Sequence, residues 1–109
     1  MGTNKTINIA SQFGKLLGGR FKNLGPYSGE EFYETLLKKN FLEAQCDNSK
    51  LVIELDGTKG YPSSFLDQSF GELARTYGVE KVCGTIEFKT KLFQWVVDYI
   101  KKDIWGKIG

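Results

Sequence analysis

The sequence of 109 residues contains no histidine. This absence excludes Ser-His-Asp and Cys-His nucleophile systems and zinc sites that use histidine. There are two cysteines, Cys46 and Cys83, which are too far apart for a Cys-x-x-Cys redox motif and too few for a metal site. We therefore expect no metal site, no cofactor and no catalytic constellation.

Long apolar runs are also missing. No stretch approaches the ~18 apolar residues of a membrane span, and no basic start precedes the apolar core of a secretory signal. The net charge of +2 is too small to indicate nucleic acid or an acidic membrane surface as a partner. We expect a cytoplasmic protein that binds neither nucleic acid nor a membrane. Its length suits one domain, residues 1–109, with its own core.

Hydrophobic periodicity predicts that strands and helices alternate along the chain. The expected strands are at 6–9, near 20–22, at 51–55 and at 80–88. The expected helices are at 29–45, 63–77 and 92–105, with a short helical turn at 13–17. This order predicts one α/β domain with a mixed sheet of about four strands and three to four helices.

Serines mark the starts of two of these helices. Ser28 and Glu31 have the spacing of a capping box, in which the serine hydroxyl bonds the glutamate amide. Ser63 or Ser64 opens the second helix, with Asp67 in its first turn. A hydroxyl at a helix amino end also lies where the free amides and the helix dipole favour an anion. The segment therefore has two interpretations, a simple helix cap or a phosphorylation site.

Five of the 13 glycines lie between residues 14 and 29. This stretch has the glycine spacing of a phosphate-binding P-loop, but Arg20 and Phe21 stand where such a loop has lysine and Ser or Thr. One interpretation is a flexible or tightly turned connection. The other is a nucleotide- or anion-binding site of Gly18, Gly19 and Arg20, folded beside the amino end of the helix that Ser63 opens.

The last predicted helix has an apolar surface wider than one core-facing stripe requires. One explanation is a closing helix wedged between the sheet and a neighbouring helix. The other is a surface for a partner or a weak dimer, formed by Trp95, Tyr99 and Trp105.

Three segments together resemble the STAS-like family of unknown function, bacterial proteins similar to the STAS domains of anti-sigma-factor antagonists. The segments are Ser28-Gly29-Glu30-Glu31-Phe32, residues 51–57 and residues 61–71. The resemblance extends from about residue 7 to residue 105, and its most specific part is Ser63-Ser64-Phe65-x-Asp67 with the following Phe70-Gly71. It implies a single STAS-like domain.

In phosphorylated STAS domains an Asp-Ser-Ser-Gly motif follows the central strand, and a partner kinase modifies its first serine. Here that stretch reads Pro62-Ser63-Ser64-Phe65, so Ser63 matches the modified serine while the aspartate and the glycine are replaced. The resemblance thus implies a non-enzymatic signalling module whose partner is a GHKL-type ATPase or a serine kinase. The expected binding surface combines the exposed side of the helix at 65–77 with the loop before it, and its key residues are Gly60, Tyr61, Pro62, Ser63, Ser64 and Asp67.

Overall fold

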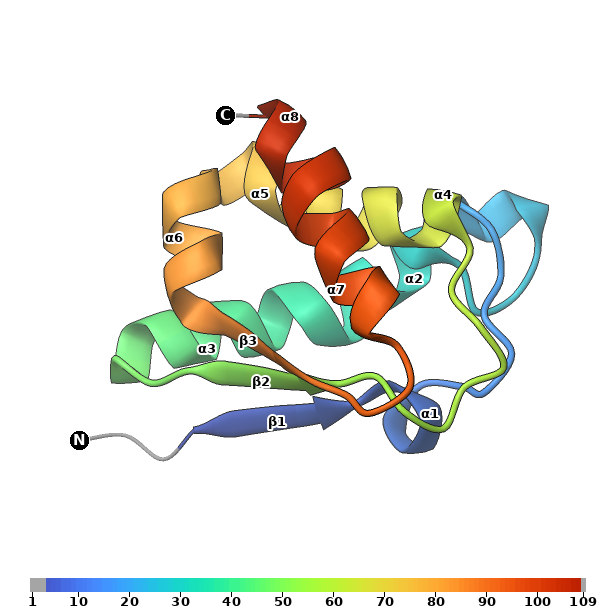
Figure 1. Ribbon diagram of the computed structural model, residues 1–109, viewed down its shortest axis with the longest axis horizontal. Coiled ribbons are helices and arrows are strands. Elements are labelled where there is room, and N and C mark those ends of the chain that lie inside the picture. The colour runs from blue at the N-terminus through green and yellow to red at the C-terminus, as the bar shows by residue number, and fades with distance from the viewer. Residues whose placement is uncertain (1–3, 109) are drawn as a thin grey trace.

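The computed structural model describes residues 4–108, apart from the side chain of Leu24; residues 1–3 and 109 of the expected domain lie outside the described residues. At its centre is a sheet of three strands, β1 (Lys5–Asn8), β2 (Leu51–Glu54) and β3 (Ile86–Lys89). The strand order is β1-β2-β3, and both pairs are parallel (Figure 1). The α/β class is confirmed, but the expected mixed sheet of four strands is wrong.

The remaining regular structure is helical. The helices are α1 (Ile9–Gln12), a 3-10 turn (Lys22–Leu24), α2 (Gly29–Phe32), α3 (Lys38–Asp47), α4 (Ser63–Leu66), α5 (Glu72–Tyr77), α6 (Val79–Thr85), α7 (Gln94–Tyr99) and α8 (Gly106–Ile108). Three π-helical segments, at Tyr33–Leu37, Asp67–Gly71 and Ile100–Trp105, join α2 to α3, α4 to α5 and α7 to α8. Three continuous helices result, which we call helix 29–47, helix 63–77 and helix 94–108.

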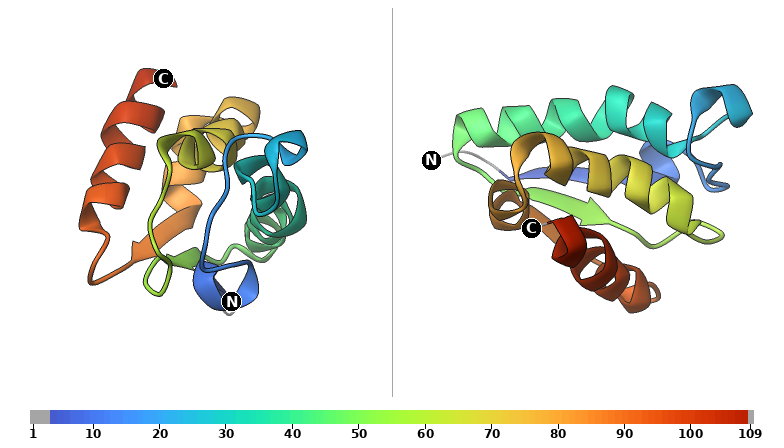
Figure 2. Two further views of the ribbon diagram at one scale, coloured as in Figure 1. Left: turned by 90° about the vertical axis from the view of Figure 1, so that its right-hand side faces the viewer. Right: turned by 90° about the horizontal axis from the view of Figure 1, so that it is seen from above.

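The three long helices lie side by side over one face of the sheet (Figure 2). Side chains of a strand point alternately to its two faces, and Ile7, Leu51 and Ile53 point to the helical face and are fully buried. On the other face Thr6 and Glu87 are exposed. The sheet therefore has one buried face, which explains why buried and less buried residues alternate along its strands.

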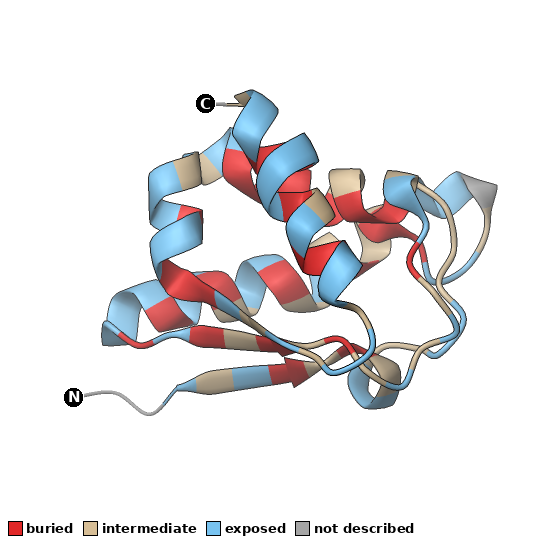
Figure 3. Cartoon of the chain, in the orientation of Figure 1, coloured by how far each residue is buried: buried red, intermediate tan, exposed pale blue. Residues whose placement is uncertain are grey.

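Aromatic rings fill much of the space between the sheet and the helices. The Phe32 and Phe65 rings stack at 5.6 Å, which holds helix 29–47 against helix 63–77. Trp105 is 2% exposed, and its indole Nε1 donates a hydrogen bond of 3.0 Å to the Phe70 carbonyl oxygen. The buried residues form one continuous layer along the inner sides of the helices (Figure 3). Helix 94–108 thus closes the core.

The surface expected on this last helix is therefore wrong in part. Trp105 belongs to the core, and Tyr99 is half-buried and packs against it. Trp95 differs, because it is 54% exposed. Of the three residues, only Trp95 presents most of its side chain for contact with another molecule.

Two expected strands differ in the structure: the one near Arg20 is not formed, and the one at 80–88 is a strand only from Ile86. Residues 22–24 make a 3-10 turn, so no strand is present near Arg20. The expected strand at 80–88 is helix α6 over most of its length, and strand β3 begins only at Ile86. Val79, Val82 and Ile86 share the spacing of one helical face, and Val82 is fully buried. Residues at positions 82 and 86 fit both patterns, because their spacing of four is compatible with one face of a helix and with alternate positions of a strand.

The expected start of helix 29–47 is confirmed. The Ser28 hydroxyl accepts a hydrogen bond of 3.1 Å from the Glu31 amide. In a standard capping box the Glu31 carboxylate would accept a hydrogen bond from the Ser28 amide. Here it accepts one of 3.1 Å from the amide of the preceding residue, Tyr27.

Within residues 4–108, no helix combines the length and the apolar character that a membrane crossing requires.

Candidate functional site

Parallel strands end at the same edge of a sheet, and the loops that follow them meet there. In this chain these loops are residues 13–28 after α1, residues 55–62 after β2 and residues 90–93 after β3 (Figure 1). The left view of Figure 2 shows all three at one end of the molecule. Ser63 and Arg20, the central residues of the two sites expected from the sequence, therefore lie at the same end.

Ser63 is the first residue of helix 63–77, and it is exposed. Pro62 holds the N-cap position, with the extended backbone of φ −62° and ψ 140°, and has no side-chain group that could bond the helix amides. The expectation that Ser63 or Ser64 is the N-cap is therefore wrong, because both serines lie inside the helix. Ser63 therefore has no capping role to perform, and the residue is exposed to solvent.

The loop before Ser63 is anchored by Tyr61. This side chain is 5% exposed, and its hydroxyl donates a hydrogen bond of 2.6 Å to the Leu55 carbonyl oxygen. Burial raises the pKa of Tyr61 to about 12. Its ring lies 5.0 Å from that of Phe93 in the neighbouring loop. Tyr61 is thus a largely buried residue that positions the loop and lines one hollow together with Gly60, which is half-buried, and Pro62, which is exposed.

Asp67 lies one turn after Ser63 and connects two arginines. Arg20 Nη1 lies 2.5 Å from one carboxylate oxygen of Asp67, and Arg75 Nη1 lies 3.1 Å from the other. Partial burial alone would raise the pKa of Asp67, but the hydrogen bonds from Arg20 and Arg75 outweigh it and hold this pKa below its ordinary value. Asp67 therefore ties the glycine-rich segment to helix 63–77.

The glycine-rich segment is tightly turned. Gly18 donates its amide to the Tyr27 carbonyl at 2.7 Å. The carbonyl oxygens of Gly19 and Arg20 accept hydrogen bonds of 2.8 and 3.0 Å from the first amides of helix 29–47, at Gly29 and Glu30. These amides are the groups that an anion would bind at this helix. Arg20 does lie beside helix 63–77, as expected, but its guanidinium is bound to Asp67.

Asp56 holds the loop after β3. Its carboxylate accepts hydrogen bonds from the Thr90 hydroxyl at 2.7 Å and from the amides of Lys91 and Leu92 at 2.8 and 3.0 Å. The bond from Thr90, followed by the two amide bonds, lowers the pKa of Asp56 below its ordinary value. The loops after β2 and β3 are therefore joined at the end of the molecule that carries Ser63.

A pH titration of Asp56→Asn tests this attachment. A carboxylate whose pKa is lower in the folded state stabilises the fold above its unfolded pKa of ~3.9, and this contribution is lost as the pH falls through the folded value. We expect the wild type to have the higher melting temperature at pH 7, and the difference between the two proteins to shrink below about pH 4. A difference that stays constant across the titration would contradict this assignment.

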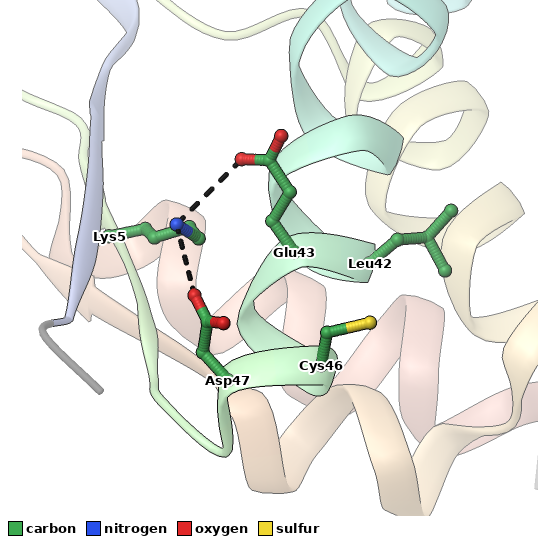
Figure 4. A pocket seen from close by; sticks show the side chains of 5 residues that line it. All are labelled: Lys5, Leu42, Glu43, Cys46 and Asp47. Atoms are coloured by element: carbon green, nitrogen blue, oxygen red, sulfur yellow. Dashed lines mark ion pairs between the residues drawn. The ribbon is translucent and has the colours of Figure 1, made fainter. Parts of the chain in front are cut away.

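A hollow of about 500 Å³ lies away from this end, between β1 and helix 29–47 (Figure 4). Lys5 Nζ lies there 3.4 Å from an Asp47 carboxylate oxygen and 3.8 Å from one of Glu43. None of the expected site residues lines this hollow.

Within residues 4–108, no three Cys, Asp or Glu side chains are grouped closely enough to hold a metal ion.

The sequence interpretation missed the exposed apolar side chains that lie near the loop before Ser63. Leu16 is 69% exposed and lines, with Leu17, Lys59 and residues 60–62, a hollow of about 370 Å³. A leucine in a glycine-rich loop, outside any periodic helix or strand, is a signal that could have indicated it, because such a residue has no core to enter.

The comparisons with known proteins place residues 28–90 in one family. No curated protein and no solved structure matches the chain. The matching family model covers helix 29–47, β2, the loop with Ser63, helix 63–77, α6 and β3, and its description is "STAS-like domain of unknown function". Since this match extends over more than half of the sequence, the chain belongs to the family of STAS-like domains of unknown function.

Proposed function

We propose that the protein is a non-enzymatic regulatory module that binds a protein partner and that phosphorylation of Ser63 controls this binding. The observation that carries the proposal is the exposed Ser63 hydroxyl, on the first residue of helix 63–77 and without a capping role. A phosphate there would add ~1.5–2 negative charges near the positive end of the helix dipole, where the fold tolerates it.

The phosphoryl donor is a nucleoside triphosphate held by a partner kinase. The Ser63 oxygen attacks the γ-phosphorus, the bond to the β-phosphate oxygen breaks, the nucleoside diphosphate leaves, and a base of the kinase takes the hydroxyl proton. The similarity to anti-sigma-factor antagonists supports a serine kinase or a GHKL-type ATPase as this partner.

The two departures from the Asp-Ser-Ser-Gly motif leave Ser63 accessible. Phe65 replaces the glycine, but its ring is fully buried and stacks on Phe32, so it does not cover Ser63. Pro62 replaces the aspartate and holds the extended backbone from which the helix begins. A kinase that recognises this loop would therefore meet an exposed proline where the motif has a carboxylate.

A quantitative pull-down from native lysate compares the wild type with Ser63→Ala and Ser63→Glu. We expect the wild type and Ser63→Ala to retain an ATPase-like protein, and Ser63→Glu to lose most of it because the added charge opposes the contact. Thr35→Glu is the matched control, since Thr35 is exposed on helix 29–47 and lies outside the three loops. Equal capture by all four proteins would refute a switch at Ser63.

The nucleotide- or anion-binding alternative at Gly18, Gly19 and Arg20 has a separate readout. A ligand that binds only the folded protein raises its melting temperature. A rise with millimolar nucleotide that disappears in Arg20→Gln would favour this alternative. We expect no such rise, because Arg20 is already bound to Asp67.

A further inference from the structure

Within the described part of the chain, five of the six large exposed apolar side chains lie in or beside the loops at the end that carries Ser63, and the sixth, Leu42, lies on helix 29–47. Leu16 is 69% exposed, Leu92 is 74% exposed and Trp95 is 54% exposed, and they lie in or beside the loops that follow α1 and β3. Exposed apolar residues that gather at one place mark a contact surface more often than scattered ones do. The outer side of helix 63–77, where the sequence places the surface, carries exposed Arg75 and Thr76 instead.

The three loops are physically joined into one surface. The Lys59 amide donates a hydrogen bond of 2.8 Å to the Lys15 carbonyl oxygen, which joins the second loop to the first. The ring of Tyr61 packs edge-on against that of Phe93, which joins the second loop to the third. The hollow of about 370 Å³ between Leu16 and Pro62 lies within this surface and has the size of a few apolar side chains.

In the first loop Lys22 pairs with Glu34, and each of the three loops also presents one exposed lysine outside such a pair. These are Lys15, Lys59 and Lys91, and within the described part of the chain none of them forms an ion pair. Of the nearby carboxylates, Asp67 pairs with two arginines, whereas Asp56 accepts hydrogen bonds from the third loop and keeps its charge close to Lys91. The surface therefore combines apolar side chains with positive charges.

We infer that this surface, which we call the lysine–leucine surface (Lys15, Leu16, Lys59, Pro62, Lys91, Leu92), docks an acidic amphipathic segment of the partner protein. Apolar side chains of that segment enter the hollow beside Leu16, and its carboxylates face the three lysines. The inference rests on the proposed function and adds the chemistry of the partner. Charge complementarity selects an acidic segment over a neutral or basic one.

The same arrangement gives the direction of the switch. Ser63 directly follows Pro62, which lines the hollow. A phosphate on Ser63 offsets much of the positive charge of the surface and repels an acidic segment. Phosphorylation therefore releases the partner, and removal of the phosphate restores binding.

Three synthetic amphipathic peptides, with one apolar face and with acidic, neutral or basic polar faces, test the docking chemistry. We expect the acidic peptide to bind about tenfold more tightly than the basic one, and high salt to reduce this difference, because several exposed charge pairs add. Amide chemical shifts are expected to change at residues 15–17, 59–61 and 91–95.

Charge reversal supplies the matched control. Lys15→Glu, Lys59→Glu and Lys91→Glu together are expected to abolish the preference for the acidic peptide. The same change at Lys38, Lys39 and Lys81, exposed lysines outside the loops, leaves the preference intact. Shifts elsewhere, an equal effect of both triple variants, or no binding of the acidic peptide at millimolar concentration would overturn the inference. None of these proteins is altered at Ser63, so this result and the pull-down can fail independently.

Discussion

Trp105→Ala is expected to remove a large part of the stability of the fold. The indole ring is 2% exposed, packs 5.8 Å from Phe88 of the sheet and donates its Nε1 hydrogen to the Phe70 carbonyl. Large-to-small substitution of a buried tryptophan costs about 3–5 kcal/mol, a large part of the 5–15 kcal/mol that stabilises a typical domain. The Phe70 carbonyl also loses its donor inside the core. Urea unfolding followed by circular dichroism measures the loss.

Trp95→Ala is the matched control on the same helix. Trp95 is 54% exposed, so its removal is expected to change the free energy of unfolding by less than about 1 kcal/mol. If both substitutions destabilise the protein equally, or if neither does, helix 94–108 is not the closing element of the core. A concentration-dependent midpoint for the wild type that vanishes in Trp95→Ala would show a dimer through this helix.

Most of the fold could be predicted from local patterns. The capping box at Ser28 and the apolar runs of helices 29–47 and 63–77 are strong signals, because burial of one helical face repeats every three to four residues. The run at 51–55 predicted β2 to within one residue. Residues 79–88 could not be assigned this way, since Gly78, at φ +99°, starts a short helix whose few apolar residues also alternate.

The sequence predicted where the candidate site around Ser63 lies in the fold, but not which residues contact one another there. The sequence placed Ser63 at the start of a helix after the central strand, and the structure has it there. It did not indicate that Asp67 binds Arg20 across 47 residues of chain, or that Tyr61 is buried. Long-range contacts of this kind depend on how the loops after different strands meet, and no local periodicity encodes that.

Gly29→Ala is expected to separate the two helices that position Ser63. A Cβ atom on Gly29 would lie 2.5 Å from the Phe65 carbonyl oxygen and 3.1 Å from the Phe65 Cα. Both are backbone atoms, so no side-chain rotation relieves the clash and helix 63–77 must shift. Such overpacking costs about 1–3 kcal/mol, although alanine is a better helix former than glycine by up to about 1 kcal/mol. We expect a net loss of stability in urea unfolding.

Gly19→Ala separates this effect from the general cost of replacing a glycine. A Cβ atom at Gly19 would meet no heavy atom within 4 Å, so the change is expected to stay within about 0.5 kcal/mol. Wild-type stability in Gly29→Ala would contradict the close approach of the two helices. The shift in Gly29→Ala also moves Phe65, the anchor two residues after Ser63, away from Phe32. Faster exchange of the Leu66 and Asp67 amides, which bond the carbonyls of Pro62 and Ser63, is therefore expected in this variant and not in Gly19→Ala, because the site depends on helix packing that a single glycine permits.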